Sequence, residues 1–550
     1  MPTFPSLPKT TILLALLFAT SNAAPAQNWL TPPSEPPGNA STPEKIALGL
    51  ALFWDEQLST SESVACGTCH FPSAGGSDPR SFAPTSTHPG HDGIFGTADD
   101  VQGSPGVVLS LADGLFAPDP QFGFRPQVTG RKAGSAINAL LNATLFWDGR
   151  AEFTYRNPIT GAVVLPAWAA LESQAVVPPM SSVEMAHQGR DWLQAASELA
   201  NKRALALSPH IPAALELWIA NRRYARLFEE AFGTPGVDVD RIAMAIAAYE
   251  RTLFADQTPL DDFMNGNSQA LTAQQQRGLD LFQNKGGCVQ CHTFPQLGKQ
   301  QFHYTGVHEV ATDLGRGAIT GLAADDGKML TPGLRNIALR APYFHNGSAS
   351  TLLEVIDFYD RGGDFDHPNK SLEIAPIGLT VAEKADLHAL LNEALTDPRV
   401  AAASGVFARP KLRSEDPNFH ASFGTATAGS DGITPYLVLD DPARLENNWR
   451  IAIADGFSFG YAWIGLDLQA DLPGRPYLGV NLHLSATPKM QVIGPITLNA
   501  DGHATVKWPL PSKPFLKGRM IAIQALVADP GGPAGFSATA ARATPLLPGH

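Results

Sequence analysis

Two copies of one five-residue pattern contain all four cysteines of the chain, and they constrain its fold more than any other feature. The copies are Cys66-Gly-Thr-Cys69-His70 and Cys288-Val-Gln-Cys291-His292. The pattern Cys-x-x-Cys-His is the attachment signature of c-type haem. Two thiols on one helical turn can add to the two vinyl groups of a haem, and the adjacent imidazole then reaches the iron from the same side. The cysteines therefore predict two covalently bound haem c groups.

Three other uses of paired cysteines fit this pattern less well. A four-cysteine zinc site does not need a histidine directly after each pair. Thioredoxin-like redox pairs would not occur twice with a histidine attached. Two structural disulfides would suit an exported protein, but bridges that close such short loops add little stability.

The surroundings of the two motifs indicate a duplicated unit. Similar apolar segments, GLALF at residues 49–53 and GLDLF at residues 278–282, precede the motifs about 220 residues apart, and such self-similarity is typical of repeated units. We expect two cytochrome c-like haem domains. The first spans residues 24–255, with helical periodicity over about 186–250 connecting the two units, and the second spans residues 256–400.

From about residue 405 to residue 550 the sequence changes character. The runs at 436–439, 477–484 and 520–527 combine β-forming residues with Gly, Pro and Asp turns and predict short strands. We expect a separate β-sandwich there. The predicted fold class is therefore mainly α, with two cytochrome c-like haem domains followed by a C-terminal all-β sandwich that acts as an accessory domain.

The N-terminus and the charge balance predict where the protein works. Lys9, an apolar stretch at 11–20 and the small residues Ser21-Asn22-Ala23 match a cleavable signal peptide over residues 1–23. Ten apolar residues are too few to cross a hydrocarbon core of ~30 Å. We expect a periplasmic or otherwise exported protein without a membrane span. The net charge of −13 gives no electrostatic support for nucleic-acid binding.

Segments outside the haem motifs resemble the bacterial dihaem cytochrome c peroxidase superfamily, which includes the MauG-type enzymes. The matching segments are residues 48–54, 136–138, 146–151, 183–185, 331–336 and 341–347. The resemblance covers about residues 46–397 and leaves out the β-sandwich. It implies that His70 and His292 are the proximal iron ligands and that the first haem reacts with peroxide.

The resemblance also implies roles for three further residues. Trp147 matches the tryptophan that relays electrons between the haems, although a plain core aromatic is the alternative. Glu184 matches the distal acid of the peroxide-reactive haem, and Gln174 matches its companion. Peroxide cleavage needs a group that accepts a proton and returns it, and desolvation in an apolar pocket raises the pKa of a carboxyl enough to do both. A surface glutamate at a helix N-terminus is the alternative for Glu184.

The second axial ligand of the second haem departs from the typical peroxidase. Where those enzymes have a methionine, fourteen residues after His345, this chain has Tyr359, and the MauG-type enzymes have a tyrosinate ligand there. Thr351 and Glu354 form a capping-box pattern that starts a helix whose apolar face includes Tyr359. We expect Tyr359 to ligate the iron, with Met329 as the rival ligand and a core tyrosine as the remaining alternative. A phenolate would lower the haem potential.

The first haem departs from the family as well. The family peroxidases often have a histidine that caps the first haem, near the position that Phe124 has in this chain. His88 or His91 could substitute for it from the long polar loop, but we expect an open, five-coordinate iron. The acids of that loop, at 92–100, miss the EF-hand pattern, and we interpret them as a solvated turn.

The Ca²⁺ site between the haems is a further departure. Its asparagine would align with Lys132, whereas the carbonyls of Arg340 and Pro342 could still contribute. Ca²⁺ is therefore possible there, and the alternative is that Lys132 supplies the positive charge itself.

The leading hypothesis is a cytochrome c peroxidase-type oxidoreductase. It would reduce hydrogen peroxide to water with electrons from a monohaem cytochrome c or a cupredoxin, whose basic face would suit the acidic surface. The first alternative is a MauG-like dihaem oxidase that uses high-valent haem to oxidise a protein or organic substrate. A non-catalytic dihaem electron-transfer protein, and a haem-bearing surface protein that binds through its β-domain, are alternatives of other classes. The sequence does not indicate an oligomeric state.

Overall fold

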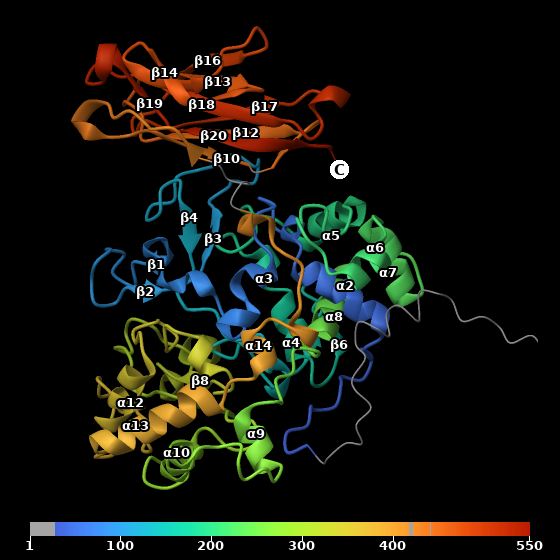
Figure 1. Cartoon of the computed structure of the whole chain (residues 1–550), viewed down its shortest axis with the longest axis vertical. Helices are drawn as coiled ribbons and strands as arrows, with labels where there is room; N and C mark the ends of the chain where they lie inside the picture. The colour runs from blue at the N-terminus through green and yellow to red at the C-terminus, as the bar shows by residue number, and fades with distance from the viewer. Residues whose placement is uncertain (1–27, 417–421, 441, 550) are drawn as a thin grey trace, which may run out of the picture.

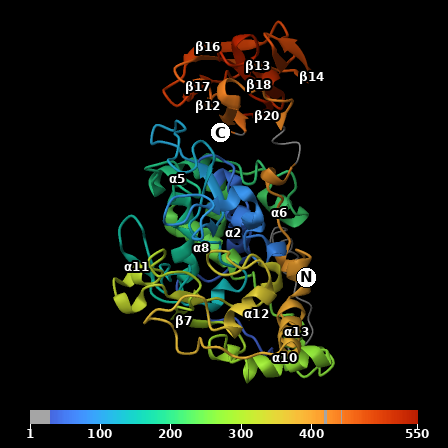
Figure 2. The ribbon, with the colours of Figure 1, turned by 90° about the vertical axis from the view of Figure 1, so that its left-hand side faces the viewer.

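The computed structural model of the chain describes residues 28–416, 422–440 and 442–549 (Figure 1). The predicted signal peptide, residues 1–23, lies outside these described residues. The described chain has two helical parts and a strand-rich C-terminal part, each with its own hydrophobic core. We refer to residues 28–255 as the first unit, residues 256–397 as the second unit and residues 422–549 as the β-domain. Figures 1 and 2 show the first unit between the other two parts.

The first unit is built around two packed helices. Its helices are α2 (Pro43–Phe53), α3 (Cys66–Cys69), α4 (Ala170–Ala175), α5 (Trp192–Asn201), α6 (Ala213–Ile219), α7 (Tyr224–Phe232) and α8 (Val239–Glu250). Thr42 caps α2 by accepting a hydrogen bond from the amide of Lys45, as expected of an N-cap residue. Helix α2 packs on α8 at Gly49, where a Cβ would lie 1.9 Å from the carbonyl oxygen of Ala245. Only glycine permits this approach.

The second unit repeats that arrangement. Its helices are α9 (Pro259–Met264), α10 (Ala273–Gln283), α11 (Gly317–Thr320), α12 (Leu352–Asp360) and α13 (Val381–Ala389), and a π-helical turn at Leu390–Ala394 continues α13. Helix α10 packs on α13 at Gly278, where a Cβ would lie 2.2 Å from the carbonyl oxygen of Asp386. The glycines of the GLALF and GLDLF segments therefore serve the same helix contact in both units, which supports the duplication inferred from the sequence.

The β-domain consists of two packed sheets. The first sheet has the strand order β10 (Tyr436–Leu439), β12 (Asn448–Ala454) and β17 (Ala504–Pro509). The second has the order β11 (Ala443–Arg444), β20 (Ala541–Leu547), β18 (Met520–Ala528), β13 (Tyr461–Asp467) and β16 (Gln491–Thr497), with β9 (Ser422–Phe423) and β19 (Phe536–Ala538) at its side. Strands β14 (Ala470–Tyr477) and β15 (Val480–Leu484) form a hairpin. One apolar cluster joins Ile451 and Ile453 of the first sheet to Ile521 and Ile523 of the second, as in a sandwich.

The chain returns to the first unit before it enters the β-domain. Val400, Phe407 and Leu412, which follow the second unit, are buried in the core of the first unit. The β-domain then lies above the hairpin of β3 (Pro105–Val108) and β4 (Pro126–Val128), which rises toward it from the first unit (Figure 1). The shorter strand pairs are β1 (Thr87–His88) with β2 (Val101–Gln102), β5 (Tyr155–Arg156) with β6 (Val163–Leu165), and β7 (Lys299–His303) with β8 (Met329–Thr331). Within the described ranges, no helix has the length and apolar character that crossing a membrane requires.

Two candidate haem cavities

Each cysteine motif lines a cavity of its own. The first cavity has a volume of about 1220 Å³ and is lined by Cys66, Cys69 and His70. The second, of about 240 Å³, is lined by Cys288, Cys291 and His292. All four cysteines are free thiols, so neither pair forms the disulfide that the sequence left as an alternative. A pair of thiols with an imidazole beside a roomy cavity is the donor set that a covalently bound haem needs, and the residues fit that group.

The two histidines of the motifs are oriented alike. Nδ1 of His70 lies 3.0 Å from the carbonyl oxygen of Gly76, and Nδ1 of His292 lies 3.2 Å from that of Leu297. Because a carbonyl only accepts, each Nδ1 carries the hydrogen and each Nε2 keeps a free lone pair for iron. Burial lowers the pKa of both histidines, that of His292 to about 4. The rings are therefore held in the neutral form that binds metals.

Glu184 and Gln174 line the same cavity as His70. Glu184 follows a turn whose Ser181 hydroxyl accepts a hydrogen bond from the Glu184 amide at 3.3 Å. Burial raises the pKa of Glu184, and the hydrogen bond from Ser181 and the charge of Arg150 only partly oppose this. Glu184 is therefore not an exposed residue at a helix N-terminus. It is a carboxyl in the wall of a cavity, with a pKa shifted in the direction that favours reversible proton transfer.

Trp147 lies between the two cavities and lines both. Its indole Nε1 donates to the carbonyl oxygen of Lys132 at 2.8 Å, and its own carbonyl oxygen accepts from the amide of Leu330 at 2.7 Å. Its ring centroid is 6.0 Å from that of His345. These contacts come from both units, so Trp147 is held at their junction.

Lys132, which the family resemblance aligns with an asparagine of a Ca²⁺ site, lies between the two units. Its side chain is buried, and Nζ donates to the hydroxyl of Ser77 and to the carbonyl oxygen of Arg340, each at 2.8 Å. Burial lowers the pKa of Lys132 to about 7, and the charge of Arg340 adds to that effect. The amine therefore donates to one of the two carbonyls that the sequence analysis considered for a Ca²⁺ ion.

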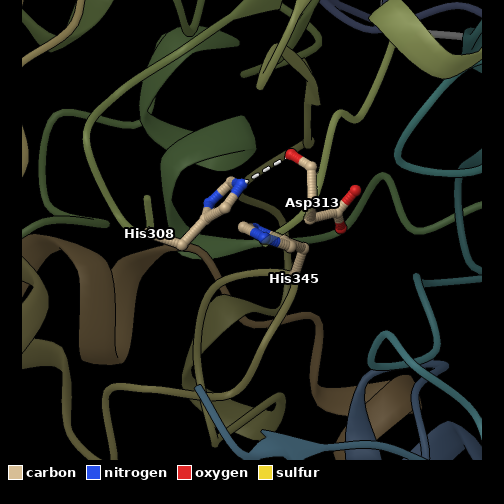
Figure 3. A group of neighbouring side chains, drawn as sticks. All are labelled: His308, Asp313 and His345. Carbon is tan, nitrogen blue, oxygen red and sulfur yellow. Dashed lines mark hydrogen bonds between the residues drawn. The ribbon is translucent and has the colours of Figure 1, made fainter. Parts of the chain in front are cut away.

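His308, Asp313 and His345 form a cluster beside this junction (Figure 3). One ligand atom of each lies within 4.8 Å of the others. Nε2 of His308 donates to the carbonyl oxygen of Asp313 at 2.9 Å, and both Asp313 carboxylate oxygens accept from Arg131 at 2.7 and 2.6 Å. This pairing leaves few free ligand atoms for a transition metal, which takes three or four protein ligands in most sites. We interpret the cluster as a hydrogen-bonded junction of the two units.

Both candidate ligands of the second haem line the second cavity: Tyr359 on α12 and Met329 on β8. The capping box of Thr351 and Glu354 starts α12 as the sequence predicts, and the helix presents Tyr359 to the cavity. Burial raises the pKa of Tyr359 far above its ordinary value. The phenol would therefore ionise only where a metal cation replaces its proton.

The structure also places the residues considered for the sixth position of the first haem. His88 and His91 line the first cavity, so both remain available to it. Phe124 is instead buried against the β-domain, with its ring centroid 5.1 Å from that of His503. In the loop that follows His91, Asp99 accepts hydrogen bonds from the amides of His91 and Asp92. It stabilises its own turn.

Glu250 is a residue of the first cavity that the sequence analysis missed. It lies one helical turn after Ile246 on α8, and both line the cavity. Its Oε2 is buried without a hydrogen-bond partner among the described residues, and burial raises its pKa to about 8. A glutamate on the apolar face of a helix was the available signal, because such a position is normally apolar.

Comparisons with known proteins agree with this geometry. The sequence profile of a family described as di-haem cytochrome c peroxidase matches residues 43–269. The chain is similar to the methylamine utilization protein MauG of Methylorubrum extorquens, with 30% identity over 66% of this chain and 81% of that protein. It is also similar to the cytochrome c551 peroxidase of Nitrosomonas europaea, with 29% identity over 64% of this chain and 85% of that protein. A crystal structure of a MauG-like protein associated with microbial copper homeostasis matches with a TM-score of 0.50 and 28% identity, over 71% of this chain and 99% of that one.

Proposed function

The chain belongs to the dihaem cytochrome c peroxidase and MauG superfamily, and from this premise we propose that it is a dihaem peroxidase that reduces hydrogen peroxide to water. The observation that carries the proposal is the first cavity, where Glu184 and His70 line one space and Trp147 joins that space to a second motif-lined cavity. Haem binding with a carboxyl available for proton transfer is what peroxide reduction requires.

The motif residues would hold the two haem c groups, Cys66, Cys69 and His70 in the first unit and Cys288, Cys291 and His292 in the second. When bound, these groups supply the iron and the electron transfer of peroxide reduction. We further propose that the cytochrome c-like domains span residues 24–255 and 256–400 and that residues 405–550 form an accessory β-sandwich. Tyr359 would be the second ligand of the second haem, with Met329 as the rival ligand.

Glu184 would transfer the proton. As a carboxylate it would accept a proton from one oxygen of hydrogen peroxide, and as a carboxylic acid it would give that proton to the other oxygen, which leaves as water when the O–O bond breaks. Two electrons from the donor and two protons from solvent would convert the remaining oxygen into a second water. Burial supports both steps because it raises the pKa of the group. Gln174, from the end of α4, lines the same cavity and would orient the peroxide by hydrogen bonding.

Trp147 would connect the two haem sites, since its ring is part of both cavity walls. The hydrogen bond from its indole to Lys132 holds the ring in place. Lys132 would hold the carbonyl of Arg340 by its hydrogen bond at this junction, so that activity would not require Ca²⁺. Electrons would come from a monohaem cytochrome c or a cupredoxin, in the periplasm or another exported location.

Peroxide-dependent oxidation of a reduced cytochrome c by the haem-loaded protein, without prior reduction of the enzyme, tests the proposal. Glu184→Gln keeps the shape of the side chain and removes its proton transfer, and we expect a loss of about 10²-fold or more in the peroxide step. Glu216→Gln is the matched control, because Glu216 is exposed on α6. Equal rates in wild type and Glu184→Gln would remove Glu184 from the mechanism.

A MauG-like oxidase acting on a protein or organic substrate is the second candidate, and the position of Tyr359 in the second cavity favours it. The same assay separates the two. An oxidase of this kind would oxidise no cytochrome c. Peroxide would instead give it an altered haem absorption spectrum that persists for a long time. A protein that does neither would be a dihaem electron carrier. The absorption bands of a tyrosinate-ligated haem should disappear in Tyr359→Phe and remain in Met329→Leu. This result would identify Tyr359 as the second iron ligand of the second haem.

A further inference from the structure

The β-domain contacts the first unit at the hairpin of β3 and β4, and the base of this hairpin holds the segment that carries Glu184. The amide of Val107 on β3 donates to the carbonyl oxygen of Val183 at 3.0 Å. The side-chain amide of Gln127 on β4 donates to the carbonyl oxygen of Ser182 at 2.8 Å. The two residues that precede Glu184 are therefore bonded to the two strands of the hairpin.

Close packing reinforces this attachment. A Cβ on Gly106 would lie 2.0 Å from the carbonyl oxygen of Val183 and 2.8 Å from the Cα of Glu184. The strand thus lies directly against the backbone of Glu184. Any shift of the hairpin base would move the carboxyl that faces the first cavity.

The other end of the hairpin is a long connection, residues 109–125, and the β-domain holds it. Arg450 on β12 donates from Nη1 to the carbonyl oxygen of Gly114 at 2.8 Å, and its guanidinium lies 5.0 Å from the ring centroid of Phe116. The hydroxyl of Thr505 on β17 donates to the carbonyl oxygen of Phe116 at 3.1 Å. Long connections are mobile unless something packs on them, and here the β10–β12–β17 sheet does so.

Apolar burial adds to these hydrogen bonds. Phe116 and Phe124 are buried in one cluster with Val438, Ala452 and Ala454 of the β-domain. Without the β-domain, both aromatic rings would lose this apolar cover and be exposed to water, which is unfavourable for such large side chains. The burial of these two rings therefore stabilises the hairpin in this one position.

The β-domain also reaches a second wall of the same cavity. Arg444 on β11 pairs with Glu62 at 2.6 Å, and Lys202 pairs with the same carboxylate at 3.0 Å. Glu62 lies just before Val64 and Ala65, which line the first cavity ahead of Cys66. Contacts of the β-domain thus hold both the segment before the first cysteine motif and the segment of the candidate acid.

We propose that the β-domain is a clamp that positions Glu184 in the first cavity through the β3–β4 hairpin, so that Arg450, Thr505, Phe116 and Phe124 are positioning residues of the peroxide site. The proposal rests on the proposed role of Glu184. A misplacement of a catalytic group by about 1 Å can lower the rate by up to 10²-fold. A long connection without support would therefore not hold the carboxyl of Glu184 accurately enough. The β-domain supplies the missing support.

The test uses the full haem-loaded chain with the double variant Phe116→Ala/Thr505→Val, which removes a buried ring and one hydrogen bond. Hydrogen–deuterium exchange should become faster at the Val107 amide and in residues 181–186. The peroxide step should slow by between about 10- and 100-fold, with the haem content unchanged. Phe116→Leu should restore most of the protection, and Phe515→Ala, which removes an exposed ring of the β-domain, is the control.

A combination with Glu184→Gln separates the two proposals. If the clamp acts through Glu184, the double variant slows wild type but produces no further loss in Glu184→Gln. If Glu184→Gln alone has no effect on the peroxide step, the proposed role of Glu184 fails, while the exchange measurement still reports on the clamp. Unchanged exchange at Val107 and residues 181–186 in the double variant would overturn the clamp itself.

Discussion

Replacement of Lys132 by methionine should change how the stability of the protein depends on pH. The ammonium is buried at the junction of the two units, and desolvation lowers its pKa from 10.5 to about 7. In the unfolded chain the lysine recovers its ordinary pKa. Between these two values the unfolded state therefore binds one more proton than the folded state, and the free energy of unfolding rises with pH.

The expected size follows from the shift. One proton of difference changes the free energy of unfolding by about 1.4 kcal/mol per pH unit, so Lys132 contributes a rise of about 3 kcal/mol between about pH 7 and pH 9. Lys132→Met lacks this contribution. The variant also leaves the Ser77 hydroxyl and the Arg340 carbonyl without their donor, which costs about 1–3 kcal/mol for each group at every pH. The two stability curves should therefore differ in slope as well as in height.

Guanidinium denaturation of the haem-loaded protein at several pH values in this window measures the difference. The burial of Arg340 lowers its pKa only to about 10, so this neighbour does not titrate in the window. Lys513→Met, which removes an exposed positive charge, is the matched control. Parallel curves for wild type and Lys132→Met would refute the reasoning, because they would mean that the buried amine keeps its proton as it does in water.

Substitutions at the half-buried Trp147 and at the buried Glu250 and Asp261 should also have measurable effects. Trp147→Phe should keep two haems per chain but slow electron exchange between them, as followed by stopped-flow absorption at the two haem bands after peroxide is added. Glu250→Gln should gain stability relative to wild type as the pH rises from 4.5 to 8. Over this range the unfolded carboxyl of Glu250 is ionised, whereas the folded one keeps its proton up to a pKa of about 8, so folding of the wild type must bind a proton. Equal stability differences between variant and wild type at the two ends of this range, measured by denaturation, would contradict this. Asp261→Asn should cost about 3–5 kcal/mol, measured by denaturation, since it leaves Arg335 buried without the carboxylate that it contacts at 2.6 Å.

Features that depend on neighbouring residues could be predicted from the sequence. The cap of α12 at Thr351 involves Glu354, three positions further on, so the capping-box pattern of the sequence identifies it. The inward direction of Tyr359 follows from helical periodicity in the same way. Gly49 and Gly278 were found as parts of a repeat, although the sequence did not show that each permits a close helix contact.

Features that depend on distant segments could not be predicted. Glu250 sits in an otherwise apolar environment, and its raised pKa arises from burial that only the packed first unit creates. The pairing of Arg444 with Glu62 joins two charged residues that pattern analysis would leave on the surface. Trp147 and Glu184 were identified through resemblance to a family, not through their spacing, because no local pattern places them at a cavity.

The sequence by itself determined the cofactor chemistry of this protein, because covalent attachment requires two thiols and an imidazole within five consecutive residues. It also determined the order of the parts, since helical and strand periodicities are local. Only the tertiary structure decided which part supports which cavity. The β-domain follows the second unit in the chain, yet it packs on the first, at Phe116 and Phe124. Burial, ion pairing and pKa shifts depend on distances between segments far apart in sequence, and folding alone sets those distances.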